Sequence, residues 1–404
     1  MAESALVNRE RSCPACSSTE TEQLLSLDPI PIHVGLLWAT PEAASACRRG
    51  EFRLRICTDC GYVWNAAFDP DLLAYEQDYD NALHHSPKFV EWERTLAESL
   101  IDDFDLRGRT LAEIGCGDGR FLALLADLGG NTGIGFEPGH NAARVSPLVA
   151  DADIEILDQF VDASTLRDSA VDFVVARHVL EHVPEPRALL DAIRDGLRAD
   201  GAVYIEVPNL AWALAHGSFE DFIYEHCGYY TPATLERLLH TVGFEEVRVE
   251  PTFDDLFVAA RARRPSQKAA AAPAIARSAI EEIRTGVQKI DAYIREAESQ
   301  LSEFADDGRK VVAWGGGARA VGLLNLPSAA ESIDLVVDVN PRKQGTFVTG
   351  SGHAIVAPER LRTERPDAVL VVNPVYRDEI ARMVADLGIE AEVLTLDGFG
   401  AEAS

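Results

Sequence analysis

The chain has 404 residues, of which 47% are hydrophobic and 25% are charged, values that are ordinary for a soluble globular protein. A chain of this length predicts about two or three domains, and the net charge of −29 argues against nucleic acid as a partner, because a phosphate backbone needs a basic face. The sequence has no uninterrupted apolar span of membrane length and no signal peptide, which predicts a cytoplasmic protein without a membrane partner.

The first candidate site is a set of four cysteines arranged as two CxxC pairs: Cys13, Cys16, Cys57 and Cys60. Four thiolates match the tetrahedral geometry that Zn²⁺ prefers. A redox pair is the alternative interpretation, but it needs only one CxxC. Because the protein would fill all four positions, we expect a structural metal rather than a catalytic one, and we interpret residues 1–70 as a zinc-binding module.

Two tyrosines, Tyr75 and Tyr79, precede an amphipathic helix that the spacing of apolar residues predicts over 87–101. One interpretation is that this whole segment covers a sheet. The other is that the tyrosines line a cofactor or substrate cleft at the entrance to the next domain.

A glycine-rich turn at 115–119 organises the centre of the chain. An apolar run at 111–114 precedes the turn, a helical pattern follows it, and a second apolar run at 132–136 ends at Glu137. This order predicts strand, turn, helix, strand and acid, in which the acid accepts hydrogen bonds from ribose hydroxyls. The GxGxG spacing differs from that of pyrophosphate-binding turns, so we predict an adenosyl ligand without phosphates. An ordinary tight turn in a parallel sheet is the alternative.

The next two predicted strands end at the same edge of the sheet. The strand at 154–157 leads into Asp158 and Gln159, which are candidates for binding the adenine amino group, and Phe160 is placed to cover the ring; a capping turn is the alternative. The strand at 171–176 runs into Arg177 and His178, whose position predicts contact with the cofactor. His178 and His182 also have the i, i+4 spacing of a metal pair on a helix, although helical packing explains them without a third ligand.

The fifth predicted strand, at 203–208, delivers Asn209 to the same edge and is followed by an aromatic insertion. The insertion places His226 after Tyr224 and Glu225, with Tyr229 and Tyr230 close behind. Histidine titrates near neutral pH and can remove a proton, and a tyrosine hydroxyl can stabilise an oxyanion. A local cluster of packed aromatic side chains is the alternative interpretation.

Beyond a linker at 263–275, helical periodicity over 275–304 predicts one long helix, and the strands predicted over 309–400 indicate a second Rossmann-like sheet. Its turn, GGGARA, lacks the spacing of a dinucleotide site. Arg319, Arg342 and Lys343 form the kind of positive cluster that a diphosphate substrate requires. Solvated surface residues are the alternative.

The motif EIGCGDGRF resembles motif I of the class I S-adenosylmethionine methyltransferases, and GFEP and RHVLEHV resemble their ribose-binding acid and fourth strand end. The resemblance implies S-adenosylmethionine as cofactor and an α/β fold with a class I methyltransferase sheet between the zinc-binding module and a second Rossmann-like domain. We predict boundaries at 1–70, 71–262, 263–308 and 309–404. The predicted cofactor-binding residues are Glu113, Gly115, Gly117, Glu137, Asp158, Gln159, Arg177 and His178.

Nearly the whole chain resembles the C-methyltransferases of deoxysugar biosynthesis, a branch of antibiotic biosynthesis, through the two CxxC pairs, YEHCGYYT, GGGARAVGLLN and VVDVNPRKQG. The resemblance implies methylation at C3 of a dTDP-4-keto-6-deoxysugar, with His226 as general base and with Tyr224 and Glu225 positioning the sugar. The candidate substrate-binding residues are Tyr75, Tyr79, Tyr229, Tyr230, Asn209, Arg319, Arg342 and Lys343.

Two other functions compete with this one. An O- or N-methyltransferase would use the same cofactor domain on another small molecule, and a non-enzymatic adaptor would use the zinc-binding module as a surface. Detection of an ether or amine product would favour the former, and a failure to bind S-adenosylmethionine the latter. The sequence leaves the oligomeric state open and is compatible with a monomer.

Overall fold

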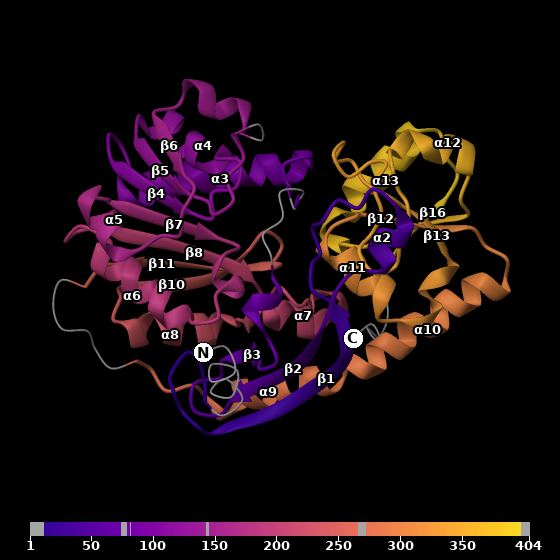
Figure 1. Ribbon diagram of the computed structural model, residues 1–404, viewed down its shortest axis with the longest axis horizontal. Helices are drawn as coiled ribbons and strands as arrows, with labels where there is room; N and C mark the ends of the chain where they lie inside the picture. The colour runs from indigo at the N-terminus through magenta and orange to yellow at the C-terminus, as the bar shows by residue number, and fades with distance from the viewer. Residues whose placement is uncertain (1–11, 74–78, 81, 143–144, 266–271, 397–404) are drawn as a thin grey trace.

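The computed structural model describes residues 12–73, 79–80, 82–142, 145–265 and 272–396, and these residues form three sheets (Figure 1). A seven-stranded sheet lies at the centre of the sequence, a five-stranded sheet at its C-terminal end, and a four-stranded sheet runs beneath both in the view of Figure 1. The predicted α/β fold class is confirmed.

The central sheet has the strand order β10-β11-β8-β7-β4-β5-β6. Its strands are β4 (Thr110–Ile114), β5 (Thr132–Phe136), β6 (Ile154–Leu157), β7 (Phe173–Arg177), β8 (Ala202–Pro208), β10 (Glu245–Thr252) and β11 (Phe257–Arg263). The strands from β4 to β8 are parallel, β11 is antiparallel to its neighbour β8, and β10, which is antiparallel to β11, runs in the same direction as the parallel strands. The parallel strands read as apolar runs because helices cover both faces of such a sheet.

The helices of this domain are α3 (Pro87–Phe104), α4 (Arg120–Gly129), α5 (Ala163–Asp168), α6 (Pro186–Gly196), α7 (Leu210–His216) and α8 (Pro232–Val242). Two of them begin where the sequence supplies a cap. Ser86 caps α3 through a bond from the Phe89 backbone N–H, and Thr231 forms a capping box with Thr234 at the start of α8. Each has proline at its first position, which needs no hydrogen bond there.

The C-terminal sheet is entirely parallel, in the order β14-β13-β12-β15-β16. Its strands are β12 (Val311–Trp314), β13 (Ile333–Val337), β14 (Ile355–Val356), β15 (Ala368–Val371) and β16 (Glu392–Thr395), and its helices are α11 (Ala318–Asn325), α12 (Leu361–Glu364) and α13 (Arg377–Asp386). The order reverses between β12 and β15, as in a doubly wound Rossmann-like sheet. The glycines at 315–317 lie at the end of β12, where such folds bind ligands.

The N-terminal sheet is formed by β1 (Thr21–Pro31), β2 (Arg49–Cys57), β3 (Val63–Asn65) and β9 (Gly228–Tyr229), with the short helix α2 (Pro41–Ser45) between β1 and β2. Its fourth strand comes from the aromatic insertion of the central domain, because β9 pairs with β3. Hydrogen bonds therefore cross the predicted domain boundary at residue 70 and join the first domain to the residues around His226.

The linker leads into two helices where the sequence predicts one: α9 (Arg277–Gln288) and α10 (Ile290–Asp306). The break at Lys289 follows Gly286, against which Leu214 packs closely, and the Lys289 N–H bonds the Gly286 carbonyl in a tight turn. Glycine is a common site of helix bending. Among the described residues, no helix combines the length and apolar character needed to cross a membrane.

Candidate functional site

The glycine turn between β4 and α4 presents bare backbone to the outside of the sheet. Gly115, Gly117 and Gly119 have φ values of 67°, 56° and 79°, a left-handed region that favours glycine. A β-carbon on Gly115 would lie 2.4 Å from the Val179 side chain, whereas one on Gly117 would meet no atom within 4 Å. Gly115 is therefore packed against Val179, two positions after β7, whereas the space next to Gly117 is open. A turn that binds a ligand requires such open space.

Glu137 at the end of β5 faces this turn. Its Oε2 accepts a hydrogen bond of 2.8 Å from the Gly117 N–H, which leaves Oε1 to accept one from a ribose hydroxyl. Burial raises the pKa of Glu137 and the Gly117 N–H opposes that rise. The predicted adenine residues follow β6, where Asp158 accepts a bond of 2.8 Å from the Gly139 N–H and Phe160 is 71% exposed. An exposed phenylalanine beside these polar groups suits an adenine ring.

Gln159 is exposed next to Asp158. Arg177 and Glu113, in contrast, lie beneath the turn rather than on its ligand face, which corrects two of the predicted cofactor contacts. Glu113 is 4% exposed, and burial raises its pKa to about 8 against the opposing charge of Arg177. The guanidinium of Arg177 lies over the ring of Phe121, with 4.3 Å between the Cζ atom and the ring centroid.

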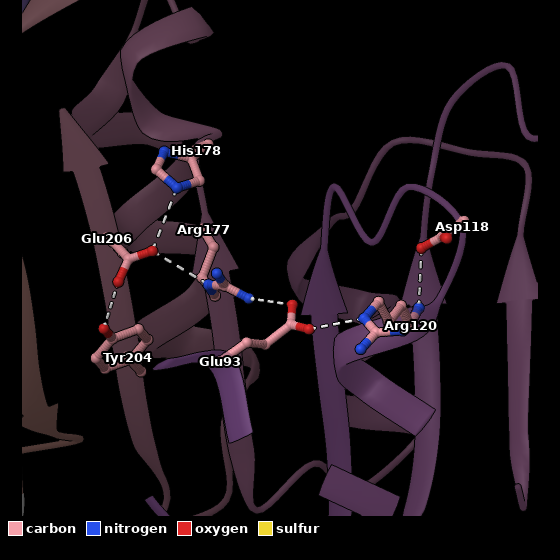
Figure 2. A network of polar contacts seen from close by, with 7 residues as sticks. All are labelled: Glu93, Asp118, Arg120, Arg177, His178, Tyr204 and Glu206. Carbon is pink, nitrogen blue, oxygen red and sulfur yellow. Dashed lines mark hydrogen bonds and ion pairs between the residues drawn. The ribbon is translucent and has the colours of Figure 1, made fainter. Parts of the chain in front are cut away.

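Arg177 belongs to a chain of buried ion pairs that crosses the domain (Figure 2). It bonds Glu93 of α3 at 3.2 Å and Glu206 of β8 at 3.1 Å, and Arg120 of α4 bonds the other oxygen of Glu93 at 2.8 Å. Burial alone would raise the pKa of Glu206, but Arg177 and His178 outweigh it and hold that pKa below its ordinary value. These charges are thus kept ionised inside the domain by one another.

His178 ends this chain at the rim of the sheet. Its Nε2 lies 3.3 Å from Glu206 and its Nδ1 lies 3.6 Å from Glu181, and its φ of 54° places it in the left-handed region. Burial alone would lower the pKa of His178, but the two carboxylates raise it to about 9. His178 is therefore a cation at neutral pH. It is engaged by protein carboxylates, and its contact with the cofactor stays a prediction.

The predicted base, His226, is partly exposed and stands against the short helix η4 (Leu180–His182) that follows β7. The ring centroids of His226 and His182 are 4.9 Å apart. His182 Nδ1 lies 3.0 Å from the Glu225 carbonyl, and Val179 just before η4 packs on Gly115. These contacts place His226 against η4, whose preceding residue Val179 packs on the glycine turn.

His226 also has the protonation state that a base needs. Burial lowers the pKa of His226 well below its ordinary value, and the neighbouring His182 and His178 lower it further. The imidazole is therefore neutral at pH 7, with a lone pair on one ring nitrogen. The sequence signals the residue type, but only the fold shows that two other histidines depress its pKa.

The carboxylate of Glu225 is bonded to other parts of the protein, and its predicted role in positioning the sugar stays a prediction. Its Oε1 accepts a bond of 2.8 Å from the Val34 N–H and its Oε2 accepts one of 2.7 Å from the Tyr79 hydroxyl. Glu225 thus joins the N-terminal segment, Tyr79 and the insertion at one point. The contact of Tyr79 with a ligand stays a prediction, and Tyr75 lies outside the described residues.

Three predicted tyrosines lie in the core, which corrects their assignment to the substrate. Tyr224 is fully buried and its hydroxyl accepts a bond from the Asp69 N–H, Tyr229 donates to the Ile223 carbonyl, and Tyr230 donates to the Leu180 carbonyl. Their hydroxyls have protein partners, so these side chains anchor the insertion rather than contact ligand.

Asn209 is also a structural residue. Its side chain accepts from the Ala211 N–H as the cap of α7 and donates to the Asp255 carbonyl at 2.9 Å, and the residue is 5% exposed. The predicted contact between Asn209 and the substrate is corrected for that reason.

The predicted basic cluster is separated in the structure. Arg319 bonds Asp221 at 2.7 Å, and exposed Arg342 bonds Asp80 at 2.6 Å, so both are neutralised by acids far away in sequence. Lys343 is 5% exposed and lines a hollow with Gly35 of the N-terminal segment and Gly316 of the second glycine turn. Lys343 lines this hollow, and its contact with a substrate stays a prediction.

The four predicted metal ligands come together. Cys13 Sγ lies 3.6 Å from Cys60 Sγ, Cys16 Sγ lies 3.6 Å from Cys57 Sγ, and all four sulfurs are within 4.8 Å of one another. Four sulfurs around Zn²⁺ at about 2.3 Å lie about 3.8 Å apart at the corners of a tetrahedron. The cysteines are not paired as disulfides. The cluster therefore fits a tetrahedral metal ion.

The chain is similar to known methyltransferases along most of its length. Residues 88–249 match the family model of a methyltransferase domain, and residues 257–390 match that of a C-methyltransferase C-terminal domain. The C-methyltransferase NovU of Streptomyces niveus is 23% identical over 392 residues, which cover 91% of this chain and 90% of that protein.

Other relatives match a smaller part of the chain. A ubiquinone biosynthesis O-methyltransferase of Idiomarina loihiensis is 25% identical over 36% of this chain and 65% of its own length. The crystal structure of a SAM dependent methyltransferase from Aquifex aeolicus superposes with a TM-score of 0.36 at 17% identity, covering 45% of this chain and 95% of that one.

The two family models together span both large sheets, and the methyltransferase model contains the glycine turn and Glu137. The residues of that turn fit the adenosyl group that the sequence predicts. The chain thus belongs to the S-adenosylmethionine-dependent methyltransferases that carry a C-methyltransferase C-terminal domain.

Proposed function

We propose that this methyltransferase transfers a methyl group to a carbon next to a ketone, namely C3 of a nucleotide-linked 4-keto-6-deoxysugar, and that His226 is the general base. The observation that carries the proposal is the position and state of His226, a neutral imidazole that stands partly exposed against η4, the short helix that follows Val179 and its contact with the glycine turn. An oxygen or nitrogen acceptor has a lone pair of its own, whereas a carbon acceptor needs a base to release one.

The reaction balances with the residues present. His226 takes the C3 proton, and the electron pair of the broken C–H bond moves into an enolate with the 4-keto group. S-adenosylmethionine, when bound, supplies a methyl group whose bond to sulfur breaks as the new carbon–carbon bond forms. Tyr79, held by Glu225 at 2.7 Å, is the hydroxyl that we assign to orienting the sugar.

The nucleotide part of the substrate is supported by Lys343. This buried lysine lines the hollow between the N-terminal segment and Gly316, and a lysine ammonium binds phosphate as a point charge. The relative NovU is a C-methyltransferase, and its similarity covers 91% of this chain and 90% of its own length, which supports the same class of acceptor.

We assign a structural role to Zn²⁺ in the cluster of Cys13, Cys16, Cys57 and Cys60. Four protein ligands leave no position for substrate, and a small sheet gains stability from a metal staple.

Product analysis tests the proposal. Purified protein is incubated with S-adenosylmethionine and a dTDP-4-keto-6-deoxysugar, and mass spectrometry and NMR identify the product. The expected result is one added methyl group bonded to C3, and its loss in His226→Asn while S-adenosylmethionine still binds. A methyl ether, or a fully active His226→Asn variant, would contradict the proposed acceptor or the proposed base.

A further inference from the structure

The carboxylate of Glu181 in η4 is buried without hydrogen bonds. Its side chain is 2% exposed, and neither of its oxygens accepts a hydrogen bond within the part of the chain that the structure describes. Its nearest cationic atom is His178 Nδ1 at 3.6 Å. A buried carboxylate without hydrogen bonds is costly, so its retention at this place indicates a task that the resting protein does not show.

Glu181 stands next to the base. One oxygen of Glu181 and one ring nitrogen each of His182 and His226 lie within 4.8 Å of one another. A single bridging water spans a separation of this size. Glu181 is thus close enough to exchange a proton with His226 but too far away to hold it in a direct bond.

The other two carboxylates near His226 already have partners. Glu225 accepts bonds from the Val34 N–H and the Tyr79 hydroxyl. Glu206 is shared among Arg177, His178 and the Tyr204 hydroxyl, which donates at 2.6 Å. Glu181 also has a charged partner, His178 at 3.6 Å, but among these three carboxylates it is the one whose oxygens accept no hydrogen bond from the described residues, so it keeps lone pairs that can accept a proton.

His182 is oriented to connect the two groups. Its Nδ1 lies 3.0 Å from the Glu225 carbonyl, which can only accept, so Nδ1 carries the hydrogen and Nε2 of the neutral ring keeps a lone pair. This fixed tautomer places an acceptor, rather than a second donor, on the side of the ring away from Glu225.

We propose that Glu181 is a positioning residue for the base: it stabilises His226 as an imidazolium and accepts its proton after methyl transfer. The inference rests on the proposed function. While the enolate exists, its negative charge balances the imidazolium. Methyl transfer neutralises the enolate and the sulfonium together, and the proton then remains on His226 in a partly buried pocket. At that stage the carboxylate of Glu181 balances the positive charge of His226 and accepts its proton. The proton then passes to solvent when the product leaves.

Hydrogen exchange isolates the step. The dTDP-4-keto-6-deoxysugar is incubated with enzyme in D₂O with S-adenosylhomocysteine in place of the methyl donor, and NMR follows loss of the C3 hydrogen. We expect Glu181→Gln to slow exchange about 100-fold while S-adenosylhomocysteine affinity is unchanged. In Glu181→Ala, added formate should recover part of the rate, because a small carboxylate can occupy the vacated space.

Glu220→Gln is the matched control, a buried glutamate that pairs with Arg319 of the C-terminal domain and whose pKa burial raises to about 7. Its exchange rate should stay within about twofold of the wild type. A wild-type rate in Glu181→Gln would overturn the inference. So would a slow rate that formate does not restore, accompanied by weakened cofactor affinity, since that pattern reports a structural role.

A divalent cation is the competing occupant, because two histidines and one carboxylate also suit a metal. Metal analysis decides between them: one zinc equivalent per chain agrees with the inference, and a second equivalent that Glu181→Gln lacks would overturn it.

If the wild type exchanges no sugar hydrogen, the proposed function has failed. NMR titration of His226 in the free protein then decides, since loss of the Glu181 charge should lower the pKa of His226 and an unchanged pKa refutes the inference.

Discussion

His178 should make the stability of the central domain depend on pH in a defined direction. Its folded pKa of about 9 lies above its ordinary value of 6.5 because Glu206 and Glu181 bind the cation. A raised pKa stabilises the fold fully below about pH 6.5, and that contribution is lost as the pH rises through about 9. A difference of about 2.5 pKa units at about 1.36 kcal/mol each corresponds to about 3 kcal/mol.

The variant that isolates this contribution is His178→Asn. Asparagine tolerates the left-handed φ of 54° better than most residues, so the substitution removes the charge without adding backbone strain. We expect the difference in unfolding free energy between wild type and variant to be about 3 kcal/mol at pH 6.5 and to shrink toward zero by about pH 9.5.

Urea titrations followed by tryptophan fluorescence at several pH values measure the difference directly. Other groups titrate in the same window, including Glu113, whose pKa is about 8, but they are present in both proteins and their contributions cancel. His240→Asn, in the last turn of α8, is the control and should show no such trend. If the difference in unfolding free energy between the wild type and His178→Asn stays constant from pH 6.5 to 9.5, the reasoning is refuted.

Three further outcomes follow from the site. Cys57→Ser should reduce bound zinc from about one equivalent to none and lower the thermal midpoint by several degrees, which metal analysis and calorimetry measure; retention of a full equivalent would contradict the four-thiolate site. Glu137→Gln should weaken S-adenosylmethionine binding about 10- to 100-fold, because a hydrogen bond to a charged group is lost, and an unchanged affinity by calorimetry would remove Glu137 from the cofactor site. Tyr79→Phe should raise KM for the sugar while cofactor affinity stays the same, and equal effects on both ligands would argue against its assignment to the sugar.

Sequence reasoning located the sheets because their signals are local. The apolar runs at 132–136 and 154–157 coincide with β5 and β6, and the turn between β4 and α4 needs glycine at positions that a side chain cannot occupy. The CxxC pairs likewise bring four sulfurs together, because metal-binding spacing is a short-range pattern.

What the sequence could not show depends on contacts between distant residues. Tyr229 pairs with Val63 through the β9–β3 ladder, which makes the tyrosines of the insertion part of the core. Arg319 meets Asp221 across 98 positions, and no local pattern marks that pairing. The sequence does not mark Glu181 as a candidate either, because what distinguishes this residue is that its buried carboxylate accepts no hydrogen bond from the described residues.

The strand that β9 contributes to the N-terminal sheet has a consequence for engineering. Cys60 stands three positions before β3, and His226 stands two positions before β9, so the cysteine cluster and His226 are attached to opposite ends of one antiparallel strand pair. The Asn65 N–H also donates to the Cys227 carbonyl at 3.1 Å. A chimaera that exchanges the first seventy residues between relatives will therefore shift the His226 imidazole unless the segment around β9 is exchanged together with β3.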